Sequence, residues 1–261
     1  MNGSELPRSP FAGLADLSDK RERRVLSRGE IERILAAHLL YLQTERHQGR
    51  RADLSAVDLS QMSFAGRNLR RAKLAQANLD SVDLTGADLV RANLAGAVLR
   101  RARLSHADLT KARLSGANLV AADLSQACLA QADLEFALMA GAVLTGARLP
   151  AADLSAVLLD DAILIGADLQ GANLRGAGLR RAMLDGADLR GARLGGAFLV
   201  GASLRGADLR GTYLRLARLD DADFCGADLR DAEGLTRKQI DLARSDDDTQ
   251  WPESLAGAGS T

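Results

Sequence analysis

Residues 87–109 read ADLVRANLAGAVLRRARLSHADL, a five-residue unit in which Leu follows Ala by two positions. On both sides of this stretch the pattern continues. A large apolar residue recurs at every fifth position from Leu54 to Leu229, through 36 consecutive units without an insertion. That residue is Leu in 33 units, and Ala stands two positions before it in 30 units. A fixed period of this kind must be interpreted before any local secondary structure is assigned.

A period of five fits neither a helix nor a plain strand. In a helix, Leu at every fifth position would be spread around the cylinder, and in a strand successive Leu would point to opposite faces. The unit therefore predicts a short extended piece, Ala-x-Leu, followed by a two-residue bend. Ala and Leu point inward, the residue between them points outward, and the frequent Gly at the last position supplies turn geometry.

Bends repeated at this interval coil the chain into a solenoid of stacked parallel strands. The units Ala87-Asp88-Leu89, Ala107-Asp108-Leu109 and Ala167-Asp168-Leu169 resemble those of the pentapeptide repeat family. The resemblance implies an all-β solenoid, a right-handed quadrilateral parallel β-helix with four units per coil and about nine coils. Departures from Ala at the inward position are few. Among them Arg67 is a charge, and we expect it to turn outward beside the cap of the first coil.

The flanking segments predict short α-helical caps at both ends of the repeats. Ser27 with Glu30 and Thr236 with Gln239 each form a capping-box pattern before a segment with apolar residues. His38 is expected to be a residue of the first cap and not a ligand. We therefore divide the chain into a flexible segment 1–26, a capping helix 27–46, the repeats 52–234, a capping helix 236–244 and a flexible tail 245–261.

Composition argues against several functional classes. The chain has 34 basic and 34 acidic residues, no apolar stretch of signal-peptide or membrane-span length, and three His that lack metal-ligand spacing. It has no phosphate-binding loop and no nucleophile motif. We predict a cytoplasmic, bacterial protein that is not an enzyme and has no catalytic residues, metal or cofactor; the bacterial part follows from the family resemblance.

The outward residue before Leu is very often Asp or Asn, and in a four-unit coil such residues form ladders along a face. We interpret these ladders as structural, because Asp and Asn can bind nearby backbone at a turn. Arg190, Arg210 and Arg230 follow the Leu of the same face, which predicts weak, solvated charge pairs.

An apolar strip interrupts the polar exterior on two neighbouring faces of the middle coils. Charge is zoned in parallel: residues 117–171 carry one basic and seven acidic residues, between two basic ends. An exposed apolar patch of this kind marks a partner or self-association surface. The predicted partner-binding residues are Phe136, Leu138, Val143, Leu158, Ile163, Ile165, Met183, Phe198 and Val200.

The first functional hypothesis is a non-enzymatic scaffold that binds another protein, or itself as a homodimer, through the apolar strip. The alternative comes from the family resemblance: a DNA-mimicking protein that binds DNA gyrase or topoisomerase and protects it against quinolones. A DNA mimic should be acidic along its whole length, whereas these repeats sum to zero charge. Nucleic-acid binding by the Arg clusters is disfavoured, because interleaved aromatic residues are missing.

Overall fold

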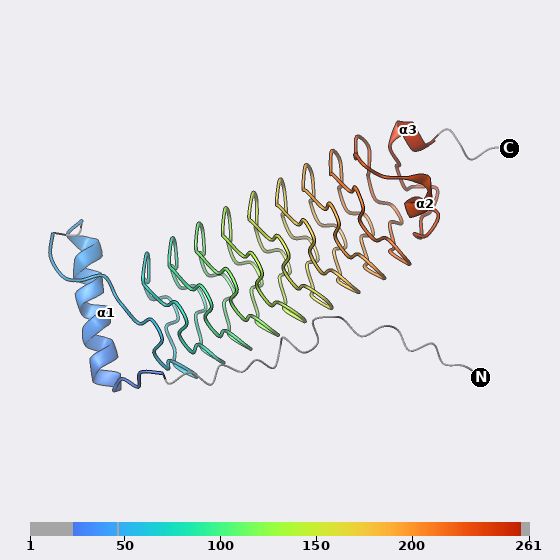
Figure 1. Ribbon diagram of the computed structural model, residues 1–261. Helices are drawn as coiled ribbons and strands as arrows, with labels where there is room; N and C mark the ends of the chain where they lie inside the picture. The colour runs from blue at the N-terminus through green and yellow to red at the C-terminus, as the bar shows by residue number, and fades with distance from the viewer. Residues whose placement is uncertain (1–22, 46, 257–261) are drawn as a thin grey trace, which may run out of the picture.

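Parallel β-bridges join residues that stand twenty positions apart, from Asp53 with Lys73 to Tyr213 with Glu233. The structure, a computed structural model, describes residues 23–45 and 47–256. In it the repeats form a long stack of coils with α1 (Arg28–Gln43) at one end and α2 (Arg237–Ile240) and α3 (Glu253–Ala256) at the other (Figure 1). Twenty residues between bridged positions means four five-residue units per coil.

Each coil has four sides, and the bridged residue of each side is the outward one between Ala and Leu. We name the sides by their first two bridged residues: face 1 (Asp53, Lys73), face 2 (Asp58, Asn78), face 3 (Ser63, Asp83) and face 4 (Asn68, Asp88). One residue of each side on each coil is a rung of that face. Within the described residues the pairing consists of single bridges, because only three residues per unit are extended before the chain bends.

The bends impose one backbone requirement on every unit. All 36 residues at the last position, from Ala56 to Asp231, have positive φ, but only 16 of them are Gly. The amide of the residue that follows donates to the Leu carbonyl three positions earlier, as Ala77 N does to Leu74 O at 3.1 Å. A β-turn with positive φ at its second central residue is the geometry that glycine adopts most easily. The sequence indicated the turn, but not that non-glycine residues would adopt it twenty times.

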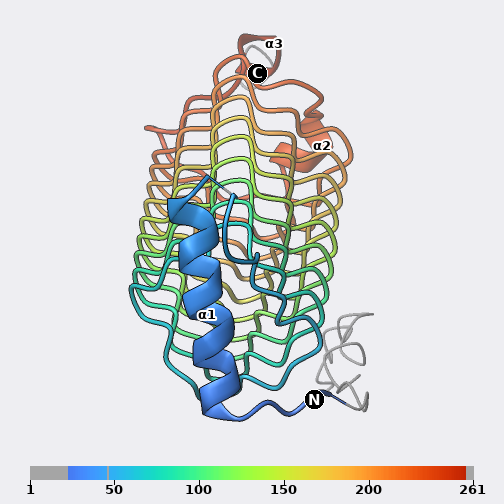
Figure 2. The ribbon, with the colours of Figure 1, turned by 90° about the vertical axis from the view of Figure 1, so that its left-hand side faces the viewer.

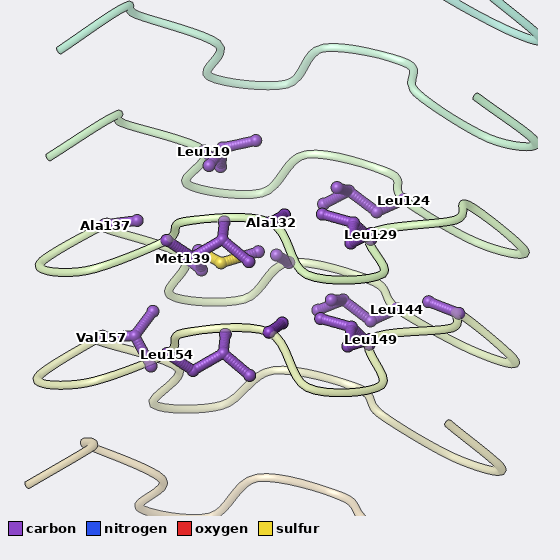
Figure 3. Packing of buried hydrophobic residues seen from close by; sticks show 14 of the residues in the cluster. Leu119, Leu124, Leu129, Ala132, Ala137, Met139, Leu144, Leu149, Leu154 and Val157 are labelled. Atoms are coloured by element: carbon purple, nitrogen blue, oxygen red, sulfur yellow. The ribbon is translucent and has the colours of Figure 1, made fainter. Parts of the chain in front are cut away.

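The interior is a continuous column of Leu and Ala. Leu54, Leu144 and Leu229 are 0% exposed, as are most of the inward Ala. Figure 3 shows Leu144 below Leu124 and Leu149 below Leu129, with Met139 filling a Leu position. Burying a Leu side chain contributes roughly 1.5–3 kcal/mol relative to leaving it exposed. Since each coil touches only its neighbours, stability accumulates along the stack.

Helix α1 lies across the open end of the first coil, as Figures 1 and 2 show from two directions. Its capping box is formed as expected, with Ser27 accepting from the Glu30 amide and the Glu30 side chain accepting from Ser27 N. Ile31 and Leu35 pack into the Leu and Ala column. The helix ends at Gln43, earlier than the expected Arg46.

Two polar residues join α1 to the first coil. His38 is fully buried and its Nδ1 accepts a hydrogen bond from Ala52 N at 3.1 Å. Burial lowers the pKa of His38, which favours the neutral ring that this contact requires. Arg67 turns outward, as expected, and its guanidinium lies 3.1 Å from Glu32 of α1.

At the other end the structure differs from the sequence expectation. The Thr236–Gln239 capping box is present, but α2 ends at Ile240 instead of Arg244. Residues 245–256 are not a free tail, because Gln250 bridges Asp228 and the Trp251 ring packs against Phe224 at 5.8 Å. Acidic and small residues suggested flexibility, whereas the exposed edge of the last coil supplies these contacts. Of the segments predicted as flexible, 1–26 and 245–261, residues 1–22 and 257–261 lie outside the described residues. The described end of the first segment is not free, because Arg24 bridges Val57 of the first coil.

Candidate protein-interaction surface

The predicted strip residues are brought together by the twenty-residue register. Leu138 bridges Leu158 on face 2, and Val143, Ile163 and Met183 are successive bridged residues on face 3. Neighbouring rungs of a sheet are about 4.8 Å apart. These five side chains therefore form two short adjacent columns on the middle coils. They are the part of the predicted strip that the fold places together.

The columns are only partly exposed. Met183 is 42% and Ile165 37% exposed, while Leu138, Val143, Leu158 and Ile163 are half-buried. Stacked side chains on adjacent rungs shield one another from solvent. The surface is thus a shallow apolar area on the rod and not a row of projecting side chains.

The ion pair of Arg181 with Asp161 lies at the corner between faces 2 and 3. The Arg181 guanidinium contacts the Asp161 carboxylate twice, at 2.7 and 2.6 Å. This carboxylate raises the pKa of Arg181. One coil earlier the corner consists of Ala140 and Gly141, which leave the two apolar columns uninterrupted there. The continuous part of the strip is therefore centred on Leu138 and Val143, with Leu158 and Ile163 at its edge.

Phe198 and Val200 are separated from that centre. Gly178 takes the rung between Leu158 and Phe198, and a Cβ added there would lie 3.1 Å from Asp160 Oδ1. The Arg180 guanidinium lies 4.7 Å from the centroid of the Phe198 ring and 3.5 Å from Asp160. A cation over the ring face covers the apolar surface that Phe198 would otherwise offer. The sequence pattern could not show this, because it places residues on faces without their side-chain directions.

Phe136 belongs to a different edge. It is a corner residue between faces 1 and 2 and is 61% exposed. Leu216, which the sequence prediction did not include, lies at the same edge and is 75% exposed. Beside Leu216 is a hollow of about 590 Å³, lined by Arg175, Arg193, Gly195, Gly196, Tyr213, Arg215 and Leu216. Phe136 and Leu216 each stand two positions after a Leu and are 80 positions apart, which is four coils of twenty residues. The same spacing rule, applied to corner residues as well as to the residues before Leu, therefore places them on one edge.

The described residues offer no metal centre, since nowhere in 23–45 or 47–256 do three His, Cys, Asp or Glu side chains gather closely enough to hold an ion. Across the same residues, no helix has the length and apolar character needed to cross a membrane. Cys128 and Cys225 are both half-buried free thiols. The surface is therefore described by its apolar columns and its charges.

Fold and surface together define a four-sided repeat solenoid whose outer residues vary from coil to coil. The chain belongs to the pentapeptide repeat family: the model for pentapeptide repeats matches overlapping segments from residue 52 to residue 231. Members of this family fold as right-handed quadrilateral β-helices. No curated protein sequence matches the chain.

Solved structures of other pentapeptide repeat proteins are similar to this chain. HetL, involved in heterocyst differentiation regulation in the cyanobacterium Nostoc sp. strain PCC 7120, is 34% identical over 81% of this chain and 92% of HetL, with a TM-score of 0.44. QnrB1, a plasmid-mediated fluoroquinolone resistance protein, is 21% identical over 76% of this chain and 91% of its own, with a TM-score of 0.34. A protein from the Arabidopsis thaliana thylakoid lumen is 28% identical over 38% of this chain and 66% of its own, with a TM-score of 0.28.

Proposed function

We propose that the chain is a non-enzymatic scaffold that binds a protein partner through the apolar columns of faces 2 and 3. The observation that carries the proposal is the stacking of Leu138 on Leu158 and of Val143, Ile163 and Met183 on one another. The inward Leu and Ala already fill the core, so these outward apolar side chains do not serve it. A contiguous apolar area with a polar rim is typical of an interaction site.

The charges around the columns suit such a role better than DNA mimicry. Duplex DNA carries one negative charge per about 1.7 Å of axis. In the acidic middle coils the carboxylates lie on different faces, with Asp123 on face 3, Asp153 on face 1 and Asp168 on face 4. Asp160 and Asp161 are paired with arginines. The carboxylates thus do not form one continuous acidic surface along the rod.

The test compares the intact chain with Leu158→Asp/Ile163→Asp in affinity capture from native cell lysate. The matched control is Ala95→Asp/Ala130→Asp, which adds the same charge at half-buried outward positions on faces 1 and 4. We expect the partner to be captured by the intact chain and the control and lost with the strip variant, while all three melt at similar temperatures. Equal capture by all three would show that the columns are not the interface.

A further inference from the structure

Face 1 carries a row of charged residues that have no ion-pair partner among the described residues. Of the described residues of this face, Lys73 and Asp53 form an ion pair at 2.9 Å near the first coil. From Arg113 onward, eight charged side chains of face 1 are at least partly exposed and form no ion pair with any residue in 23–45 or 47–256. They are Arg113, Asp133, Glu135, Asp153, Arg175, Arg193, Arg215 and Glu233.

The charges on this row are segregated by sign. Asp133 and Asp153 are bridged neighbours, so two carboxylates occupy adjacent rungs. The next coils carry Arg175, Arg193 and Arg215 around the hollow beside Leu216. Like charges on adjacent rungs repel one another. An acidic block followed by a basic block is unfavourable within one chain, but it complements an identical face that runs in the opposite direction.

The pairing follows from a two-fold axis that lies in the plane of face 1 along the strand direction and crosses the rung of Asn173. Rotation about this axis generates a partner whose rungs run in the opposite order. Each outward column of one chain then lies opposite the same column of its partner. Asp153, one rung before Asn173, then faces the partner's Arg193, one rung after it. Glu135 faces the partner's Arg215 in the same way. Arg113 faces the partner's Glu233, three rungs from the axis.

The two most exposed large apolar residues of the repeats lie at equal distances on either side of the same two-fold axis. Phe136 is two rungs before Gly176 on the edge between faces 1 and 2, and Leu216 is two rungs after it. The partner's Leu216 therefore faces Phe136. The hollow beside Leu216 is open because Gly195 and Gly196 have no side chains, and Tyr213 lies against Gly195, with Cε1 3.3 Å from where a Cβ would be. This gives the partner's Phe136 ring a place to enter.

Two further contacts complete the row. Asp133 faces the partner's Tyr213, whose hydroxyl can donate to the carboxylate. Arg175 faces its own counterpart close to the axis, and this is the one like-charge contact in the arrangement. The uncharged Asn173 occupies the axis itself.

We propose that face 1 binds a second copy of this chain, antiparallel and face to face, about a two-fold axis at Asn173. From Arg113 to Glu233 the contact is about 29 Å long, six rung spacings of ~4.8 Å. A surface of this size with several charge pairs gives a weak dimer that salt dissociates. The inference goes beyond the proposed function, because it uses face 1 and not the apolar columns of faces 2 and 3.

The experiment reverses the charges of one pair. Arg215→Glu and Glu135→Arg are made singly and together, and dissociation constants are measured by sedimentation velocity at low salt. We expect each single change to weaken the dimer at least about tenfold, since it opposes like charges twice across the axis. The double variant restores both pairs and should return close to the intact chain. An equal mixture of the two single variants, differently tagged, should form mixed dimers.

Arg148→Glu is the matched control, because Arg148 is an exposed arginine of face 4 that forms no ion pair within the part of the chain that the structure describes. It should associate like the intact chain, and circular dichroism should show all variants folded. An intact chain that stays monomeric at its highest attainable concentration would overturn the proposal. So would single variants that dimerise normally, or a double variant that stays as weak as the singles. Loss of the dimer in Leu158→Asp/Ile163→Asp alone, with the face 1 variants unaffected, would place self-association on the apolar columns instead.

Discussion

Faces 4 and 1 are neighbours on the same coils. Several charged side chains of face 4 form ion pairs with one another, whereas those of face 1 from Arg113 onward form none within the described residues. On face 4 the carboxylates of Asp188 and Asp208 contact Arg190 and Arg210 at 2.6 Å. Arg190 also lies 3.6 Å from Asp208 on the next rung, so the pairs join into a ladder along the face. On face 1, none of the charged side chains from Arg113 to Glu233 has an ion pair within the described residues.

This difference shows that the outward residues of a unit can change without any change in its inward residues. Leu149 under face 4 and Leu154 under face 1 are both 0% exposed and lie in the same column. The inward residues build every coil alike, whatever points outward. One face can therefore carry a ladder of ion pairs, as face 4 does from Asp188 to Arg230, while the charges of its neighbour stay without ion pairs.

The largest effect should come from the shared core. Leu149→Ala and Leu154→Ala each remove a buried side chain, and each should cost about 2–5 kcal/mol in the free energy of unfolding. The two costs should be similar, because the core beneath the two faces is the same. Denaturant unfolding measures them, with Leu149→Met as a volume-conserving control that costs less than about 1.5 kcal/mol. A large difference between the two Ala variants would show that the outer charges do influence the core.

An intermediate effect is expected at the edge that faces 4 and 1 share. Gly191 lies on this edge with φ of 65°, and an added Cβ would have no atom within 4 Å. Gly191→Ala should therefore cost about 1 kcal/mol through backbone strain alone. Ala151, on the same edge with φ of 53°, already bears this strain. In thermal unfolding, Ala151→Gly should not destabilise the chain, and a clear loss of stability there would contradict the strain explanation.

The smallest effect should separate the two faces directly. Arg210→Ala breaks exposed pairs on face 4 and should lower the stability of the monomer only slightly at neutral pH. Arg193→Ala on face 1 breaks no ion pair and should leave the stability of the monomer unchanged. Urea unfolding at low protein concentration checks both, since dilution suppresses association without screening the ion pairs. A greater loss of stability from Arg193→Ala would contradict the contrast.

The paired carboxylates of faces 3 and 4 should make the stability of the fold depend on pH. The hydrogen bond from Arg210 lowers the pKa of Asp208, and Arg190 does the same for Asp188. A lowered carboxylate pKa stabilises the fold above the unfolded value of about 3.9, and this contribution is lost as pH falls through the folded value. Arg103 on face 3 lowers the pKa of Asp83 to about 2. NMR titration should find Asp83 midpoints near this value, and Arg103→Gln should return them toward about 3.9.

Much of the fold was accessible from the sequence because the period is local and repeated. The inward Leu and Ala, the two capping boxes and the outward turn of Arg67 follow from spacing and from the cost of burying polar groups. The four units per coil were implied by the family resemblance. The ends were harder. Residues 245–256 have the composition of a flexible tail, but they pack on the last coil because an open strand edge and Phe224 are available there.

The candidate surface was only partly accessible. Spacing placed Leu138 with Leu158 and Val143 with Ile163 on adjacent rungs. It could not show that Arg180 covers Phe198, since the direction of a long side chain depends on its neighbours in space. Nor did it connect Phe136 with Leu216, which are 80 positions apart in the chain but lie along one edge of the rod.

The five-residue period of Leu and Ala is enough to specify a solenoid, because only a chain that bends in every unit can bury all of these apolar side chains. Only the tertiary structure decided which outward residues meet. Ion pairs such as Arg181 with Asp161 depend on the rotation of flexible side chains across coils, which no spacing rule specifies. The same is true of the charges on face 1, whose lack of ion pairs with other described residues depends on where the side chains of the neighbouring rungs point.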